Sequence, residues 1–489
     1  MKKIKLIISL ATAMFLTSCS DWLDVQPETE KDRTELISSA NGFKQMVYGT
    51  YINMTSTSLY GDALTYGFLS GLARDYTYKP AYNSSNWKDY QYTMSGVRSQ
   101  IDNIWSKMYN NIVNVNSVLN SIGEKKSLFD NNEGDLVEGE MLAMRAYCHF
   151  DLLRMFAPAY ADNPDAIAIP YVETYETARY PHIKSSEVVT KVLADLDKAE
   201  KCFVAGNDPL ISGKQDITYS GKGNFTANRQ YRFNYWAVLA EKARVYLYMG
   251  NKEKALEYAE KVIKEGPFSW ASESAVSSGD RVFQTELITA LEVTSLPDYY
   301  DAGFKSEKYC LYEMGWSSPN VYTKIIFDDT NDYRYLYLLT NDKYNNKTIP
   351  CKYNQETGSG KTMKKQTVPL IRLGEMYMIA AECLASSVPD KAIELLRDLR
   401  LHRGYLTNDC GIADGLSEDA IKQVIAKEMR KETYLEGQMW FYLKRLQSSQ
   451  VPYYTTWGNP VTNVDQSVYT FPMPEDEKEY GIIPTVDNK

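Results

Sequence analysis

Three glutamates near the C-terminus have the residue type and spacing that catalysis could use. Glu428, Glu432 and Glu436 recur at every fourth position, so they share one face of a helix. Two carboxyl groups about 5 to 9.5 Å apart suffice to hydrolyse a glycosidic bond. The alternative is a structural ion-pair cluster with arginines of adjacent helices. We expect the cluster, because these positions belong to a helical framework rather than to a cleft. The candidate partners are Arg372, Arg397, Arg400 and Arg445.

The three histidines of the chain do not indicate a nucleophilic site. His149 falls within a predicted helix, where a hydrogen-bonded core histidine is favoured over a base. His182 and His402 lie beside Pro181 and Arg403, without a serine or cysteine partner in any recognised pattern. No glycine-rich phosphate motif follows a strand-like run. We therefore expect a protein that is not an enzyme and that needs no cofactor.

Metal sites have equally weak support. Asp328, Asp329 and Asp332 could hold a calcium ion with backbone oxygens, but the glycine hinge and bidentate glutamate of a calcium loop are missing, so a solvated turn is favoured. The cysteines form no C-x-x-C pair and have no histidine at zinc spacing. Cys148 and Cys383 fall on predicted buried helix faces and should be inert. An exported protein can form disulfides, but the sequence assigns none.

The N-terminus predicts export and lipid attachment. Three lysines precede an apolar run over 6–16, which is shorter than the roughly 20 residues of a bilayer span. The run ends in L-T-S-C, a lipobox, so residues 1–18 are expected to be a signal peptide and Cys19 to carry a diacylglyceryl thioether. Two or more acyl chains suffice for stable anchoring. The alternatives are an ordinary secretory signal with a chance cysteine, or retention at the inner membrane through Ser20 and Asp21.

Charge and length restrict the class of protein. Without residues 1–18 the chain loses three lysines and no acidic residue, so its formal net charge changes from −9 to −12. A nucleic-acid partner is not expected at that balance. No linker rich in glycine, serine or proline divides the remainder, and we expect one large unit over 19–489.

Aromatic residues are unusually abundant outside the predicted helices. The chain has 39 tyrosines and 8 tryptophans, and many lie in two segments without helical period, 67–96 and 268–368. The face of a pyranose stacks on an aromatic ring while nearby amides and carboxylates bind its hydroxyls. The same surface would also suit a protein partner. Long insertions of this kind tend to carry function.

Helical periodicity predicts the framework that positions these segments. Apolar residues recur at three or four positions over 40–55, 97–122, 136–156, 187–203 and 370–446. Residues 234–267 form the clearest unit, with two helical segments, a Gly250-Asn251 turn and a terminal Pro267, which is typical of a tetratricopeptide hairpin. Pairs around 101–156 and 370–403 would stack on it. The predicted fold is mostly α, a tetratricopeptide-like framework with long irregular insertions.

Several motifs in this order resemble one known family. They are D-x-L-D-x-x-P at 21–27, R-x-G-E-x-Y-x-x-A-A-E at 372–382, L-R-x-L-R-x-x-R-G at 396–404, E-x-R-K-E-x-x-x-E-G-x-x-W-F-x-L-x-R at 428–445 and F-P-M-P at 471–474. The chain resembles the SusD/RagB family of nutrient-binding outer-membrane lipoproteins. The resemblance divides it into an N-terminal part (about 19–230), the hairpin at 234–267, an insertion at 268–368 and a C-terminal helical part (369–489).

The resemblance implies a lipid-anchored protein on the outside of the outer membrane that captures glycan fragments and passes them to a TonB-dependent transporter of the SusC type. Its ligand site would be built from loops outside the framework, including the one before the helix that carries Trp105 and Tyr109. By location alone, the ligand-contact candidates are Trp87, Tyr82, Asn83, Arg74 and Asp75, with Trp270, Tyr299 and Trp316 from the insertion. Two alternatives remain: a peptide ligand in the same system, or an envelope scaffold that binds no small ligand.

Overall fold

The computed structural model describes residues 33–78, 87, 89–213, 225–306, 309–312, 326–342, 347–355, 365–452 and 461–484. Cys19 and the expected signal peptide lie outside these ranges. The long helices are α3 (Ala40–Met54), α6 (Ser95–Ile122), α7 (Glu133–Phe156), α8 (Ser185–Ala205), α9 (Tyr235–Tyr248), α10 (Lys252–Glu265), α15 (Leu373–Leu384), α16 (Pro389–Leu401), α17 (Glu418–Glu432) and α18 (Gln438–Arg445).

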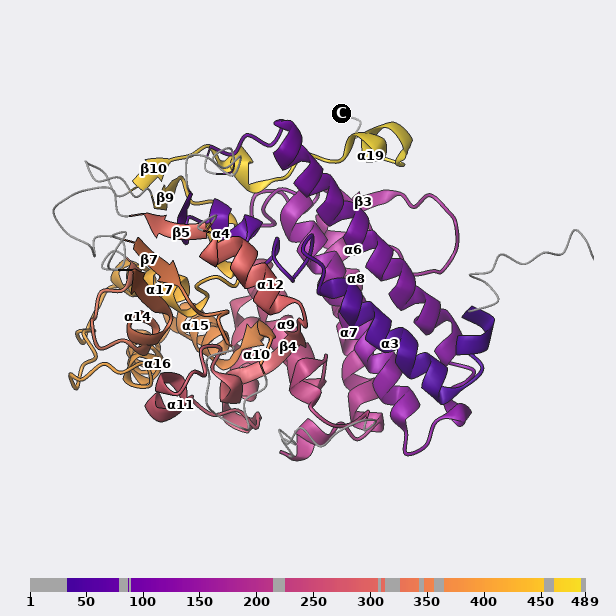
Figure 1. Cartoon of the computed structure of the whole chain (residues 1–489), viewed down its shortest axis with the longest axis horizontal. Helices are drawn as coiled ribbons and strands as arrows, with labels where there is room; N and C mark the ends of the chain where they lie inside the picture. The colour runs from indigo at the N-terminus through magenta and orange to yellow at the C-terminus, as the bar shows by residue number, and fades with distance from the viewer. Residues whose placement is uncertain are drawn as a thin grey trace, which may run out of the picture.

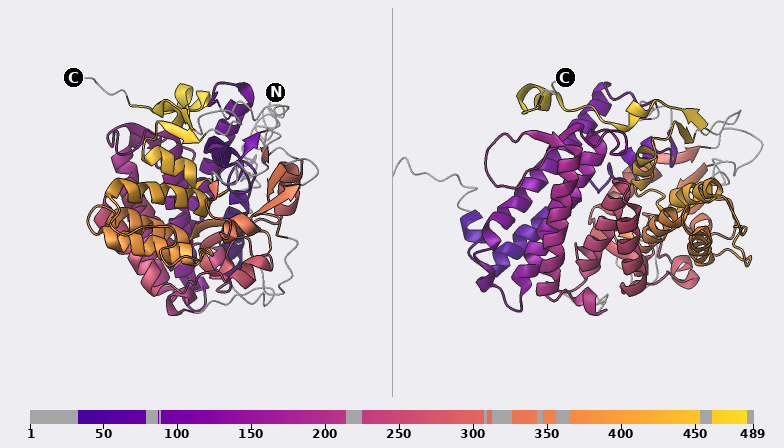
Figure 2. Two further views of the ribbon diagram at one scale, coloured as in Figure 1. Left: turned by 90° about the vertical axis from the view of Figure 1, so that its left-hand side faces the viewer. Right: turned by 180° about the vertical axis from the view of Figure 1, so that it is seen from behind.

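These helices pack in a continuous series of neighbours. α6 packs on α7, α7 on α8, α8 on α9, α9 on α10, α10 on α15 and α15 on α16. Figure 1 shows α3, α6, α7 and α8 on one half of the molecule and α15, α16 and α17 on the other, and Figure 2 shows the same arrangement from the side and from behind. The prediction of a mostly helical, tetratricopeptide-like framework is confirmed.

Local sequence explains where these helices begin. The side chains of Asn234 and Asn251 accept hydrogen bonds from backbone N–H groups in the first turns of α9 and α10. Gly250 between the two helices has φ +80°, a left-handed conformation that glycine adopts without steric cost. Both helices lie within 234–267. Pro389 occupies the first position of α16, where its missing N–H has no consequence.

Short strands and short helices complete the structure. The strands are β1 (Thr77–Tyr78), β2 (Ile167–Pro170), β3 (His182–Lys184), β4 (Leu287–Glu292), β5 (Tyr309–Tyr312), β6 (Leu339–Asp342), β7 (Lys347–Pro350), β8 (Thr367–Arg372), β9 (Gln450–Pro452) and β10 (Val461–Asn463). The short helices are α4 (Phe68–Leu72), α11 (Glu273–Ser277), α12 (Leu296–Tyr300), α14 (Tyr333–Tyr337) and α19 (Glu475–Tyr480).

The insertion at 268–368 contains more regular structure than its sequence indicated. β4 pairs antiparallel with β8 at the start of the C-terminal helical part, and one sheet has the order β1-β5-β7-β6. These strands have two to six residues, too short for alternation to be distinguished from irregular sequence. β1 belongs to the aromatic segment 67–96, so the sheet joins the two segments that were expected to contact ligand.

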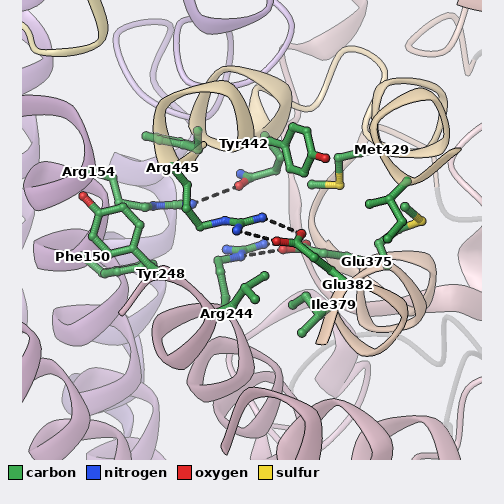
Figure 3. A pocket seen from close by; sticks show the side chains of 15 residues that line it. Phe150, Arg154, Arg244, Tyr248, Glu375, Ile379, Glu382, Met429, Tyr442 and Arg445 are labelled. Carbon is green, nitrogen blue, oxygen red and sulfur yellow. Dashed lines mark hydrogen bonds and ion pairs between the residues drawn. The ribbon is translucent and has the colours of Figure 1, made fainter. Parts of the chain in front are cut away.

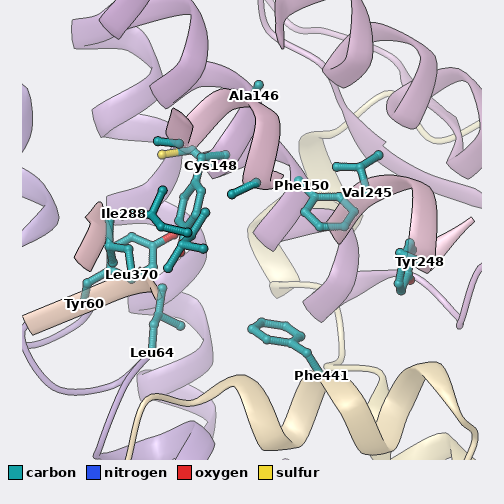
Figure 4. Packing of buried hydrophobic residues seen from close by; sticks show 14 of the residues in the cluster. Tyr60, Leu64, Ala146, Cys148, Phe150, Val245, Tyr248, Ile288, Leu370 and Phe441 are labelled. Atoms are coloured by element: carbon teal, nitrogen blue, oxygen red, sulfur yellow. The ribbon is translucent and has the colours of Figure 1, made fainter. Parts of the chain in front are cut away.

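The main core lies where the N-terminal and C-terminal halves meet. Figure 4 shows Tyr60, Phe150 and Cys148 packed near Val245, Ile288 and Leu370, with Phe441 contributed by α18. Burial raises the pKa of the Cys148 thiol, as expected for an inert apolar residue. None of the helices within the described ranges is both long and apolar enough to cross a membrane.

Candidate functional site

The glutamates with catalytic spacing lie in a buried ion-pair network. Glu428, Glu432 and Glu436 are 0%, 1% and 7% exposed. Glu432 accepts hydrogen bonds from Arg403 (2.6 Å), Arg372 (2.7 Å) and Arg334 (3.0 Å). The expected cluster is therefore present, and these carboxylates do not face a cleft.

Only part of the expected set of partners is correct. Arg400 donates to Glu428 at 2.7 Å, and Arg372 joins Glu432 to Glu436. Arg397 instead donates to the carbonyl of Ile412, and Arg445 pairs with Glu382, so these two predictions were wrong. The network also contains Glu286, Arg334 and Lys352 from the insertion and Arg403, which follows α16, and the sequence indicated none of these four. Lys431, in the same helix as the glutamates, pairs with Glu428.

The surrounding charges keep these carboxylates ionised. Burial alone would raise the pKa of Glu432, but the guanidinium groups of Arg403 and Arg372 outweigh it and hold the pKa well below its usual range. The same balance lowers the pKa of Glu428, where Lys431, Arg334 and Arg400 supply the positive charge. A general acid needs a proton near neutral pH. Neither residue meets that requirement.

The aspartates considered for calcium have other partners. Asp332 accepts from the guanidinium of Arg334 at 2.6 Å, and Asp328 accepts from Lys431 at 2.7 Å. Asp329 accepts from the backbone N–H of Asn331 at 2.8 Å. Across the part of the chain that the structure describes, no group of three or more His, Cys, Asp or Glu residues is arranged to hold a metal ion. Asp328 and Asp332 thus neutralise cations, which the expectation of a solvated turn did not include.

His149 is a structural residue. Its Nδ1 lies 2.9 Å from the carbonyl of Arg145, its Nε2 accepts from the N–H of Val172 at 3.0 Å, and its ring stacks on Tyr171 at 3.9 Å. Burial lowers its pKa to about 3, so the ring is neutral at physiological pH. The expectation that His149 belongs to the core is confirmed.

A small cavity lies between α7, α9, α15 and α18. Its volume is about 40 Å³, far below the roughly 300–1,000 Å³ of a ligand pocket. Figure 3 shows its polar walls, where Arg445 forms a two-fold hydrogen bond with Glu382 and Arg244 forms one with Glu375. The cavity has room for water but not for a sugar ring.

The buried carboxyl group of Glu241, beside this cavity, should make the stability of the folded protein depend on pH. Its Oε2 accepts from Arg244 at 3.0 Å, while its buried Oε1 has no hydrogen-bond partner among the described residues. Burial raises its pKa from 4.5 to about 7. The folded state then binds more protons than the unfolded state between these values, so stability falls as pH rises through this window. We expect Glu241→Gln to flatten the fall in unfolding free energy between about pH 5 and 7, measured by urea denaturation. An unchanged slope of unfolding free energy against pH in the variant would contradict this prediction.

A large cleft with aromatic walls lies beside the predicted aromatic segment. It measures about 870 Å³ and is lined by residues 90–94, Pro158, Ala159, Asp162, Lys444, Gln447 and most of 465–472. We call it the aromatic cleft. Its rings are those of Tyr90, Tyr92, Tyr469 and Phe471, and its polar groups include Gln91, Gln447 and Gln466. Rings and side-chain amides on one surface are the combination that binds sugars.

Hydrogen bonds hold the tyrosines of the aromatic cleft in place. The hydroxyls of Tyr90, Tyr92 and Tyr469 donate to the carbonyls of Leu72, Val468 and Ser448 at 3.1, 2.5 and 2.9 Å respectively. Tyr90 has φ +54°, a conformation that is uncommon for residues other than glycine and that is often found at functional sites. Because the rings are already positioned, a ligand would lose little affinity to ordering them.

Two residues predicted from the sequence support the aromatic cleft from behind. Trp87 is half-buried and packs edge-on against Phe68 at 5.2 Å, and Phe68 packs on Phe471 in the cleft at 5.4 Å. The guanidinium of Arg74 lies over the ring of Tyr90 at 5.6 Å. Arg74 is itself buried. Both residues therefore position rings of the cleft.

Asp75 has no exposed surface. Its carboxylate pairs with Arg430 at 3.2 Å and accepts from the backbone N–H of Leu435 at 3.3 Å. It joins the aromatic segment to the C-terminal helices, and in this conformation it does not reach a ligand. The prediction that Asp75 contacts ligand directly is therefore corrected. Residue type did not decide this, because an aspartate in a polar aromatic segment can contact a ligand or pair with a buried cation.

The candidates from the insertion lie apart from one another. Trp270 stacks on His402 at 5.1 Å and packs against Tyr377 of α15. The structure does not bring Trp270 to the aromatic cleft. Tyr299 lies in α12, half-buried against the core. Tyr82, Asn83 and Trp316 lie outside the described residues.

β1 and β5 pair antiparallel, with Tyr78 opposite Tyr309, so the described ends of segments 67–96 and 268–368 meet in one sheet. No pattern in the sequence indicated this pairing, or that Gln447, Gln466 and Tyr469 line the aromatic cleft. The only available signal for the last two was their position just before the F-P-M-P motif.

Comparison with known proteins gives consistent matches over the whole chain. A family model described as "Starch-binding associating with outer membrane" matches residues 21–210, and a model described as "SusD family" matches residues 200–481. SusD-like protein P2 of Formosa agariphila is 23% identical, covering 98% of this chain and 97% of that protein.

Solved structures show the same fold. A SusD superfamily protein from Bacteroides thetaiotaomicron matches with a TM-score of 0.72 at 20% identity, covering 91% of this chain and 99% of that one. A SusD-like carbohydrate binding protein from Bacteroides vulgatus matches with a TM-score of 0.69 at 19% identity, covering 92% and 99%. At these identities the likeness is one of fold.

Proposed function

Because this chain belongs to the SusD family, whose model spans residues 200–481, we propose that it binds glycan fragments at the cell surface and delivers them to a SusC-like TonB-dependent outer-membrane transporter. The proposed mechanism is capture and transfer without covalent chemistry. The protein would be anchored through lipid on Cys19, as the lipobox predicts. The helical framework would face the transporter and the aromatic segments would face the ligand.

The aromatic cleft is the observation that carries the proposal. It combines rings held in place by hydrogen bonds with exposed or half-exposed amides and hydroxyls, and its volume suits an oligosaccharide. Related proteins lend support, since one matched structure is described as carbohydrate binding. The buried network around Glu432 argues against the rival glycosidase, because its carboxylates remain ionised and inaccessible.

Calorimetry of the mature protein lacking Cys19, against panels of oligosaccharides and peptides, tests the proposal. We expect one glycan class to bind. Replacing Tyr90 by alanine should weaken that binding by about 1–3 kcal/mol, the range for loss of one stacked aromatic ring. Tyr90→Phe retains the ring and is the matched control, so it should lose much less.

Each other outcome identifies an alternative. Binding of peptides alone would assign the protein to the peptide-binding variant of this system. Absence of binding to either panel would favour an envelope scaffold, which should instead lose partner proteins when the framework surface is mutated. Equal losses in Tyr90→Ala and Tyr90→Phe would contradict the stacking role of Tyr90.

A further inference from the structure

A second cleft with aromatic and polar walls lies further along helix α6 from the aromatic cleft. It measures about 620 Å³ and is lined by residues of 102–109 in α6, by Pro170 and Val172, by 178–180 and by most of 474–481. We call it the acidic cleft, because Asp102, Glu475, Asp476 and Glu477 contribute to its walls.

Aromatic rings also line the acidic cleft. Trp105 is only 7% exposed and is held by Tyr109 and Phe156, each with its ring 4.8 Å away. Tyr480 of α19, which lines the same cleft, is 58% exposed. An exposed ring beside polar side chains is the combination that the aromatic cleft also offers to a sugar.

One face of α6 connects the two clefts. Met94 lines the aromatic cleft, Asp102 and Tyr109 line the acidic cleft, and Arg98 lies between them on the same helix face. From Met94 to Tyr109 this face extends about 22 Å at 1.5 Å per residue. Arg98 donates to the carbonyl of Met473 at 2.7 Å and to Asp102 at 3.2 Å, which holds the C-terminal segment along the helix.

The C-terminal segment lines both clefts in turn. Phe471 and Pro472 belong to the aromatic cleft, and Pro474 and Glu475, two residues further on, belong to the acidic cleft. Figures 1 and 2 show this segment crossing the upper edge of the molecule from β10 to α19, past the N-terminal end of α6. The two clefts are therefore adjacent along one edge.

The charges along this edge restrict the ligand. Acidic residues line both clefts: Asp162 and Asp465 in the first, and Asp102, Glu475, Asp476 and Glu477 in the second. The basic residues are fewer. Arg179 is exposed, Arg98 is engaged by Met473 and Asp102, and Lys444 is buried and donates to the carbonyl of Ala157. A polyanionic chain would be repelled along this edge.

We propose that the aromatic and acidic clefts form one continuous track for an extended, uncharged glycan of several sugar units. This inference rests on the proposed glycan-binding function and adds its ligand length and charge class. The aromatic cleft holds one part of the chain. The exposed Tyr480 ring and the polar side chains of the acidic cleft hold another.

A size series tests the track by calorimetry. The probes are malto-, xylo- and mannooligosaccharides from disaccharide to octasaccharide, with oligogalacturonates of matched length. For the series that binds, we expect affinity to rise by about tenfold or more from disaccharide to octasaccharide, as one further stacked ring would provide. In Tyr480→Ala and in Ser106→Trp, which fills the acidic cleft from α6, that ratio should fall to about twofold or less.

Matched controls separate the outcomes. Tyr48→Ala removes a similarly exposed tyrosine from α3, outside the track, and should retain the full ratio. Equal affinity for all lengths, or an unchanged ratio in both track variants, would overturn the inference while leaving glycan binding intact. Oligogalacturonates that bind as tightly as the uncharged series would overturn its charge class. Wild-type protein that binds no probe of any length would contradict the proposed function itself.

Discussion

Replacing Glu432 by glutamine is expected to lower the free energy of unfolding by about 3–5 kcal/mol, the usual cost of removing one partner from a buried ion pair. Glu432 is 1% exposed and binds three guanidinium groups, those of Arg334, Arg372 and Arg403. Glutamine has similar size but no charge, so it leaves the three cations without their shared counterion. Urea denaturation followed by circular dichroism measures the change.

Glu418→Gln is the matched control for this experiment. Glu418 lies in the first turn of the same helix, α17, and pairs with Lys422 at the surface, where an ion pair contributes little. We expect its unfolding curve to coincide with that of the wild type within error. A Glu432→Gln protein as stable as the wild type would show that the network contributes no net stability.

Replacing Gly437 by alanine should also destabilise the protein strongly. Gly437 precedes α18 with φ +74°, and a Cβ built there would lie 2.2 Å from the carbonyl oxygen of Leu64. The left-handed conformation costs a residue with a Cβ about 1–2 kcal/mol. Displacement of the Leu64 backbone should add about 1–3 kcal/mol, because a closely packed interior accommodates extra atoms poorly. The midpoint of urea denaturation reports the sum.

Gly250→Ala separates these two contributions. Gly250 has φ +80°, but a Cβ there meets no atom within 4 Å, so only the conformational cost applies. The expected loss is therefore about 1–2 kcal/mol. If Gly437→Ala lowered the free energy of unfolding no more than Gly250→Ala, the clash with the Leu64 backbone would add nothing to the conformational cost.

Much of the framework could be predicted because helices are specified locally. Periodic apolar residues, the caps at Asn234 and Asn251 and the turn at Gly250 act within a few positions of one another, so each is visible in the sequence. The ion-pair role of Glu428 and Glu432 followed in part from the same reasoning. It correctly included Arg372 and Arg400, which lie on or beside neighbouring helices of the same motif set.

The remaining partners depend on contacts between distant segments. Arg334 lies 98 residues from Glu432 in the chain, and no spacing rule connects them. Asp75 and Trp87 have the composition of a binding surface, yet Asp75 pairs with Arg430 and Trp87 packs on Phe68. Residue type alone does not distinguish an aromatic ring that contacts ligand from one that supports it.

The sequence by itself determined the helical class and the aromatic character of segments 67–96 and 268–368, since these depend on local pattern and composition. Lipid attachment at Cys19 stays a prediction. Only the tertiary structure decided which aromatic residues share a cleft. Tyr90 and Tyr469 line one surface because the aromatic segment and the C-terminal segment cross beside α6, where Tyr92 donates to the carbonyl of Val468. Contacts between residues so far apart in the chain form through the packing of the whole framework, and no local pattern encodes them.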